Sequence, residues 1–265
     1  FLTIKLKYLY SSTPDLENSL FKKSKFSNCK YIYLQHSPVS LNLIYNENAF
    51  DSFDAIQTIS DYQYSEFNEI KKLKKLKARP FKSEYLFIKN VEKKLRKPLN
   101  DKIDVIIAPS WNTGFYELNC HESLHRFLRE KNISYKLRPH PMSFKKKEIS
   151  VSELNKFGIN LDKDEHIDFK NFNFLISDWS GIFIEYALIC MKKSYLINTP
   201  KKDKNSYYKR YSNVPVEISM RNDFANTFDV DKIENLVEKI FKFKIENNFS
   251  IKDEKLIEII KKRFY

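Results

Sequence analysis

The sequence predicts an α/β protein with mostly parallel sheets, and three observations support this prediction. Short apolar runs rich in β-branched and aromatic residues alternate along the chain with segments of helical period. The chain has 265 residues, 42% of them hydrophobic, and can bury one large core or two smaller ones. A charged stretch with a proline, at residues 89–102, interrupts the alternation. We therefore expect two domains, residues 1–99 and 100–265, joined near Asn100.

The apolar runs place seven strands, at residues 2–10, 31–35, 55–59, 103–108, 135–138, 174–177 and 195–198. Helical periodicity predicts helices at residues 62–76, 122–131, 230–241 and 253–262. A further amphipathic pattern follows the polar turn at residues 177–181, and Pro14 and Asp15 fit the first turn of an early helix.

The net charge of +13 favours anionic partners such as nucleic acid, an acidic membrane surface or phosphorylated substrates. Each lysine run by itself fits a solvated face, whereas the set together fits a basic side that faces anionic lipid. No RNA-binding or zinc-finger pattern accompanies these runs, and we expect no nucleic acid partner. The chain holds only 3 glycines, which excludes a glycine-rich dinucleotide loop or a Walker loop.

Three widely separated cysteines, Cys29, Cys120 and Cys190, argue for a reducing compartment and against a disulfide framework. No apolar stretch approaches the length that spans a membrane. We expect a cytoplasmic protein that can also lie on the inner face of the cell membrane. Because the chain begins with Phe1 and not with Met, we allow for a missing upstream part of the N-terminal domain.

Polar clusters follow three of the predicted strands, at residues 35–38, 138–141 and 177–181. Ligands of open α/β sheets lie outside the carboxyl ends of the strands, so these clusters are expected to face one cleft. The last cluster stands between a strand and a helix. A helix that begins at a Ser and Gly turn offers unpaired backbone N–H groups and a positive dipole end, and both favour phosphate.

The order of these segments resembles the CDP-glycerol glycerophosphotransferase family, the polymerases of teichoic acid and capsule. The matching segments are QHSP at residues 35–38, APSW at 108–111, RPHP at 138–141 and SDWSG at 177–181. The apolar stretch at residues 183–190 resembles the helix that follows the turn in that family. The resemblance runs from about residue 30 to about residue 215.

The resemblance implies a GT-B-like protein, with two Rossmann-like domains facing across a cleft, an N-terminal acceptor side and a C-terminal donor side. It implies a transferase that moves glycerophosphate, or a related phospho-polyol, from a CDP-activated donor to a hydroxyl of a polymer or lipid-linked acceptor. It implies no metal, and no cofactor apart from the CDP-linked substrate. His36 is then the general base, with His140 as a second catalytic histidine. The residues implied for binding the donor and its phosphates are Arg138, Ser177, Asp178, Ser180 and Gly181.

Structural interpretations stand beside these roles. His36 would otherwise be an ordinary histidine at a strand end, Trp111 fits a packing role, and Asp178 and Ser180 fit helix caps. Two departures from the family's motifs matter. QHSP lacks the Gly and Thr that usually follow the histidine, and this difference concerns the acceptor. Gly181 stands where relatives carry Ser, and this difference concerns the donor.

Two other function classes stay open on the sequence. One is a GT-B glycosyltransferase that uses a different nucleotide sugar, and the other is a non-catalytic module that binds an anionic polymer. A third signal, HExxH at residues 121–125, matches the zincin protease motif. It lies inside the α/β alternation and lacks a partner motif for a third ligand, so we expect no zinc there.

Overall fold

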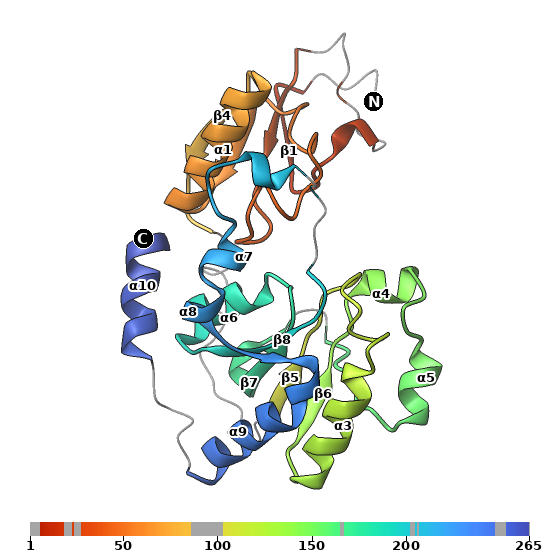
Figure 1. Cartoon of the computed structure of the whole chain (residues 1–265). Helices are drawn as coiled ribbons and strands as arrows, with labels where there is room; N and C mark the ends of the chain where they lie inside the picture. The colour runs from red at the N-terminus through yellow and green to blue at the C-terminus, as the bar shows by residue number, and fades with distance from the viewer. Residues whose placement is uncertain are drawn as a thin grey trace. The chain divides into compact units, whose positions relative to one another are not determined.

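The structure is a computed structural model (Figure 1). It describes residues 6–18, 23, 28–85, 103–164, 167–201, 205, 207–246 and 253–264. The contacts divide the chain into two compact units. The first unit comprises residues 1–89, 203–219 and 260–265, and the second comprises residues 90–202 and 220–259.

The first unit contains a four-stranded parallel sheet in the order β1-β2-β3-β4. The strands are β1 (Tyr8–Ser11), β2 (Lys30–Tyr33), β3 (Ala55–Thr58) and β4 (Arg79–Lys82). Helix α1 (Asp61–Lys74) follows β3 and begins at Ser60, whose side chain accepts a hydrogen bond from the backbone N–H of Gln63. The short helix α7 (Val216–Ser219) and a 3-10 turn (Leu16–Asn18) also belong to this unit.

Aromatic packing builds the core of the first unit. Tyr33 is fully buried, and its ring meets the rings of Phe50 and Phe53 edge to face at centroid distances of 5.2 and 5.3 Å. Ile56 from β3 and Phe67 from α1 are buried in the same cluster. Edge-to-face pairs add about 0.5–1.5 kcal/mol each beyond the area they bury, so this cluster fixes the sheet against α1.

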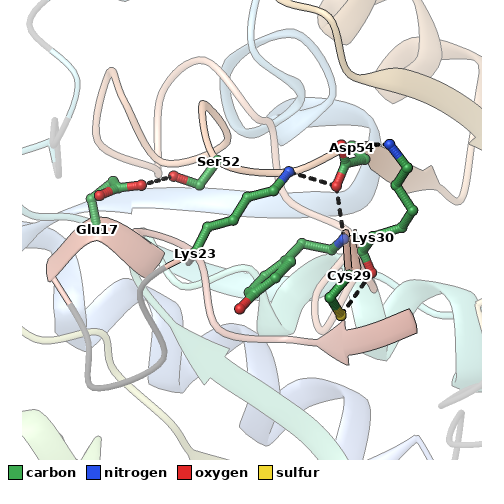
Figure 2. Close-up of polar contacts among 7 residues, drawn as sticks. Glu17, Lys23, Cys29, Lys30, Ser52 and Asp54 are labelled. Carbon is green, nitrogen blue, oxygen red and sulfur yellow. Dashed lines mark hydrogen bonds and ion pairs between the residues drawn. The ribbon is translucent and has the colours of Figure 1, made fainter. Parts of the chain in front are cut away.

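Ion pairs hold the amino end of the same sheet (Figure 2). Asp54, just before β3, accepts from Lys23 Nζ at 2.6 Å and from the backbone N–H of Tyr31 at 2.8 Å, with Lys30 Nζ at 3.7 Å. The Asp54 side chain is partly exposed, so each of its ion pairs stabilises by less than about 1 kcal/mol. The polar contacts at this end therefore serve the fold, while the candidate site residues lie at the opposite, carboxyl end of the strands.

The second unit contains a five-stranded parallel sheet in the order β6-β5-β7-β8-β9. The strands are β5 (Ile103–Ile107), β6 (Tyr135–Leu137), β7 (Phe172–Ser177), β8 (Ser194–Asn198) and β9 (Ala225–Asp229). The chain adds β6 on one side of β5 and the later strands on the other side. The direction of winding thus changes between β5 and β7, and this position is the topological switch point of the sheet.

Helices of the second unit cover the sheet through apolar faces. They are α3 (Cys120–Glu130), α4 (Pro141–Lys145), α5 (Val151–Lys156), α6 (Ile182–Cys190), α8 (Arg221–Phe224) and α9 (Ile233–Ile245), and α10 (Glu254–Phe264) is the last helix of the chain. Leu124 and Leu128 of α3 pack with Leu236 and Ile240 of α9 in one buried cluster. The described residues contain no helix of the length and apolar character needed to cross a bilayer.

The two parallel α/β sheets confirm the predicted Rossmann-like fold class. Strands β4 and β9 were not predicted. Both are edge strands with polar residues, and β4 contains Pro80, which an edge strand tolerates because one side of it makes no ladder bonds. The early helix at Pro14 is a correction, because Asp15 is left-handed (φ 58°) and only a 3-10 turn follows it.

The predicted join near Asn100 lies outside the described residues, as do residues 2–5 of the first predicted strand. The sequence assigns residues 203–219 to the C-terminal domain, whereas their contacts group them with the first unit. The chain therefore returns to its first unit after the β8 strand of the second. This return brings Glu217 beside the loop that follows β2, as described below.

Candidate active site

The switch point of the second unit carries two polar segments, the loop at residues 108–113 after β5 and the turn at residues 178–181 after β7. Asp178 joins them. Its fully buried carboxylate accepts from the backbone N–H of Ser110 at 2.7 Å and from the hydroxyl of Thr113 at 2.6 Å. The Ser177 hydroxyl donates to the Ala108 carbonyl at 2.7 Å. Asp178 and Ser177 are therefore the residues that bind the two segments together across the switch point.

Arg221 of α8 supports this turn, and no sequence pattern predicted its role. Its guanidinium donates to the Asp178 carbonyl at 2.8 Å, to Asn198 Oδ1 at 3.1 Å and to the Ile197 carbonyl at 3.3 Å. It also lies 4.0 Å from the ring centre of Trp179. Burial lowers the pKa of Arg221 to about 10, against the opposing effect of Asp178, so the group is charged at neutral pH.

The only two tryptophans of the chain lie at this edge of the sheet. Trp179 Nε1 donates to the carbonyl of Thr199 at 2.7 Å. The Trp111 ring lies 6.3 Å from the ring of His140, so the loops after β5 and β6 also meet here. Within the described residues, the Thr199 hydroxyl and Arg221 Nε are buried polar atoms without a hydrogen-bond partner. Such atoms are uncommon and often mark a functional position.

The RPHP segment follows β6. Arg138 donates to Asp162 Oδ2 at 2.6 Å and to the Asp164 carbonyl at 2.8 Å. Its guanidinium is thus engaged by neighbouring acceptors, and its assignment to the donor phosphates stays a prediction. His140 caps α4, with its Nδ1 accepting from the backbone N–H of Met142 at 3.1 Å. A neutral histidine that accepts at Nδ1 carries its proton on Nε2, so this nitrogen of His140 is a donor.

The turn residues Ser180 and Gly181 open α6, a nine-residue helix. Ser180 Oγ accepts from the backbone N–H of Ile182 at 3.5 Å, a long contact, and Gly181 makes no side-chain cap. Gly181 has φ −61° and ψ −10°, which any residue adopts. The backbone therefore does not require glycine at the position where the resembled family carries Ser, and the difference concerns the missing hydroxyl.

His36 lies in the first unit, in the loop that follows β2. Its Nδ1 lies 2.9 Å from the hydroxyl of Tyr33, and its carbonyl accepts from the hydroxyl of Tyr85 at 2.9 Å. Although the residue is exposed overall, the protein around its ring lowers its pKa, against the opposing effect of the Ser12 carbonyl. His36 is therefore neutral at pH 7, the state in which a histidine can accept a proton.

Two buried carboxylates anchor the His36 loop from other elements. Glu217 of α7 accepts from the backbone N–H of Ser40 at 2.9 Å and from the Ser40 hydroxyl. Glu66 of α1 accepts from the backbone N–H of Leu41 at 2.9 Å. Burial raises the pKa of both carboxyl groups above the usual range of glutamate. No sequence pattern predicted either residue, because only the tertiary fold brings them to this loop.

The HExxH segment lies at the start of α3. His121 is buried against the rings of Tyr116 and Phe157, whereas His125 Nδ1 contacts the hydroxyl of Tyr135. The two histidines thus have different neighbours. Within the described residues there is no cluster of three or more His, Cys, Asp or Glu side chains placed to hold a metal ion.

No family model matches the chain, and no curated protein matches it. Among solved structures it is similar to a UDP-forming α,α-trehalose-phosphate synthase from Burkholderia vietnamiensis, at 8% identity and a TM-score of 0.46, over 95% of this chain and 66% of that one. The corresponding synthase from Burkholderia xenovorans has 8% identity and a TM-score of 0.42, over 87% and 64%. The chain is also similar to TarM, at 12% identity and a TM-score of 0.40, over 89% of this chain and 48% of that one. The chain spans less than two thirds of the length of these structures.

Proposed function

We propose that the chain is a nucleotide-dependent transferase that moves glycerophosphate, or a related phospho-polyol, from a CDP-activated donor to a hydroxyl of a glycan polymer or lipid-linked acceptor. The observation that carries the proposal is the pair of polar segments at the switch point between β5 and β7, joined by Asp178. Ligands of doubly wound sheets bind at this position. The order of the RPHP and SDWSG segments supports the choice of donor.

The reaction is a displacement at phosphorus. The acceptor oxygen forms a bond to the glycerol-bearing phosphorus, the pyrophosphate P–O bond breaks, and CMP leaves with that electron pair. The acceptor's proton passes to a base, and His36 has the neutral imidazole that this step needs. In this proposal the backbone N–H groups at the start of α6 and Nε2–H of His140 stabilise charge on the leaving phosphate.

A thermal-shift screen of nucleotides tests the donor class. A ligand that binds only the folded protein raises its melting temperature, by an amount that depends on concentration over Kd. We expect CDP and CMP to raise it more than UDP or ADP at equal concentration. Stabilisation by UDP in preference to CDP would favour the glycosyltransferase alternative, and no stabilisation by any nucleotide would contradict the proposal.

A transfer assay with CDP-glycerol tests the histidines. We expect His36→Ala and His140→Ala each to lose most of the transfer rate, since general acid–base catalysis contributes about 10²–10⁴-fold. His125→Ala is the matched control, because His125 lies on α3 and contacts Tyr135 of β6, outside the proposed site. Wild-type rates in either site variant would remove that residue from the mechanism.

The charge of the chain bears on where the acceptor is met. A net charge of +13 favours association with an anionic lipid surface, where a lipid-linked acceptor is held. Sedimentation with vesicles that contain anionic lipid, at low and high salt, tests this part of the proposal. Binding that is equal to neutral and anionic vesicles would contradict it.

A further inference from the structure

Two tyrosines, Tyr33 and Tyr45, connect the ring of His36 to the interior of the first unit through hydrogen bonds. His36 Nδ1 lies 2.9 Å from the Tyr33 hydroxyl, and the Tyr33 hydroxyl donates to the Tyr45 hydroxyl at 3.2 Å. Tyr33 is fully buried and Tyr45 nearly so. The rings of both tyrosines also meet the His36 ring edge to face, at centroid distances of 6.2 and 5.9 Å. The ring of His36 is therefore held by packing as well as by a hydrogen bond.

The direction of the hydrogen bonds among His36, Tyr33 and Tyr45 follows from the number of protons that each hydroxyl can donate. A phenol has one proton and donates one hydrogen bond. Burial raises the pKa of Tyr33 far above neutrality, so its hydroxyl keeps that proton. Since the Tyr33 proton is directed to Tyr45, the Tyr33 oxygen can only accept from His36. The contact at 2.9 Å is then an Nδ1–H donation to Tyr33.

We propose that Tyr33 and Tyr45 are positioning residues that hold the proton of neutral His36 on Nδ1 and leave the lone pair on Nε2. Tyr33 acts through direct contact with the ring, and Tyr45 acts one step away by accepting the Tyr33 proton. The inference rests on the proposed function for its consequence in catalysis, but the tautomer itself is a property of the folded chain. The Ser12 carbonyl faces the same ring and favours the protonated form, so it is the group that competes with this arrangement.

The consequence for catalysis concerns which nitrogen is basic. A general base must present a lone pair to the acceptor hydroxyl, and only one nitrogen of a neutral imidazole has one. With the proton on Nδ1, Nε2 takes the acceptor's proton and the resulting imidazolium still donates to Tyr33. His140 has the opposite tautomer, because its Nδ1 accepts from a backbone N–H. The two histidines are thus set for opposite roles, base and hydrogen-bond donor.

Long-range proton–nitrogen NMR on the whole chain with ¹⁵N-labelled histidine tests the tautomer directly, with His36→Ala to assign the signal. We expect the Nδ1–H form of His36 in the wild type. Tyr45→Phe removes the acceptor of the Tyr33 proton, which then turns toward Nδ1, so His36 should switch to the Nε2–H form. Tyr33→Phe should give the same switch, because an imidazole without a partner at Nδ1 prefers Nε2–H.

Tyr85→Phe is the matched control. It removes the hydroxyl that donates to the His36 backbone carbonyl and leaves the contacts of the His36 ring in place, so the Nδ1–H form should persist. An Nε2–H form in the wild type, or an unchanged tautomer in both Tyr33→Phe and Tyr45→Phe, overturns the proposal.

Transfer kinetics test the catalytic consequence separately. We expect Tyr45→Phe to lower kcat by about 10²-fold with little change in KM, as for loss of a general base. If the tautomer switches as described and the wild type transfers nothing from CDP-glycerol, the positioning role stands and the proposed function fails. If the wild type transfers and the tautomer switch leaves kcat unchanged, His36 is not the base. The catalytic role of Tyr33 and Tyr45 then fails, while the transferase function stands.

Discussion

The loop after β2 in the first unit and the turn after β7 in the second both follow parallel strands, and buried carboxylates hold both, but these carboxylates come from different parts of the chain. In the second unit the predicted ligand Asp178 is itself the anchor, and its carboxylate binds donors of the neighbouring loop. In the first unit Glu217 and Glu66 reach in from separate helices to anchor the loop, and His36 takes no part in this anchoring. Asp178 at the end of β7 thus stabilises the fold of the second unit. His36 after β2 has no such role in holding its loop and is available for chemistry.

Removing the anchor of the second unit should have the largest effect on stability. In Asp178→Ala the buried donors of Ser110 and Thr113 lose their acceptor, and we expect the free energy of unfolding to fall by about 3–5 kcal/mol. Asp178→Asn is the control, since it keeps one carbonyl acceptor and should lose less. Urea denaturation measures both, and an equal loss in the two variants would contradict the anchoring role.

The anchor of the first unit should contribute less. In Glu217→Ala the donors of Ser40 lose their partner, but the cost of burying a carboxyl group disappears as well. We expect a loss of about 1–3 kcal/mol at pH 7 by urea denaturation. A loss larger than that of Asp178→Ala would reverse the comparison between the two units.

A pH series sharpens the difference further. Burial raises the folded-state pKa of Glu66 well above 4.5, the value of an unperturbed glutamate. Between 4.5 and the folded-state pKa, the folded chain therefore binds this proton more tightly than the unfolded chain does. This group therefore destabilises the fold as the pH rises through that interval, by at most about 1.4 kcal/mol per pH unit, and its penalty is absent below 4.5.

The quantity to measure is the difference in unfolding free energy between the wild type and Glu66→Gln, from pH 4 to pH 7. It removes the contributions of other carboxyl groups that are common to both proteins. We expect the wild type to lose stability relative to the variant as the pH increases. A difference that is constant with pH would show that Glu66 titrates alike in the folded and unfolded chains.

The smallest expected effect is that of Ser177→Ala. It removes one hydrogen bond, from the Ser177 hydroxyl to the Ala108 carbonyl, and should cost about 1 kcal/mol. Ser180→Ala at the same turn is the control, because within the described part of the chain its hydroxyl makes only the long contact with Ile182. Equal losses in the two variants would mean that the Ser177 bond adds nothing to the joining of the two loops.

The sequence predicted the central strands and missed two of the four edge strands, β4 and β9, for a physical reason. A strand buried on both faces is a continuous apolar run, as in β5 and β7, and such a run is visible without its neighbours. The edge strands β4 and β9 expose more of their length, and their residues are mixed in polarity. Their place in the sheet depends on pairing with a neighbour, which the local pattern does not contain.

The candidate site divides in the same way. The turn at residues 177–181 was predictable because its polar residues are contiguous and stand between a strand and a helix. Arg221 and Glu217 were not, because they lie 43 residues from Asp178 and 177 residues from Ser40. The pairing of Arg138 with Asp162 was also invisible, since a sequence shows a basic side chain but not the acceptor that engages it.

The position of the two tryptophans allows the unfolding of the second unit to be followed by tryptophan fluorescence. Trp111 and Trp179 both lie in loops of the second unit, whereas tyrosines line the core of the first. Tryptophan fluorescence, excited at the red edge of the absorption spectrum, therefore comes from the second unit alone. Far-ultraviolet circular dichroism averages over both units. Unfolding curves recorded in the two ways would coincide only if the units lose their structure together. A difference between the midpoints of the two curves would show that the two units unfold independently.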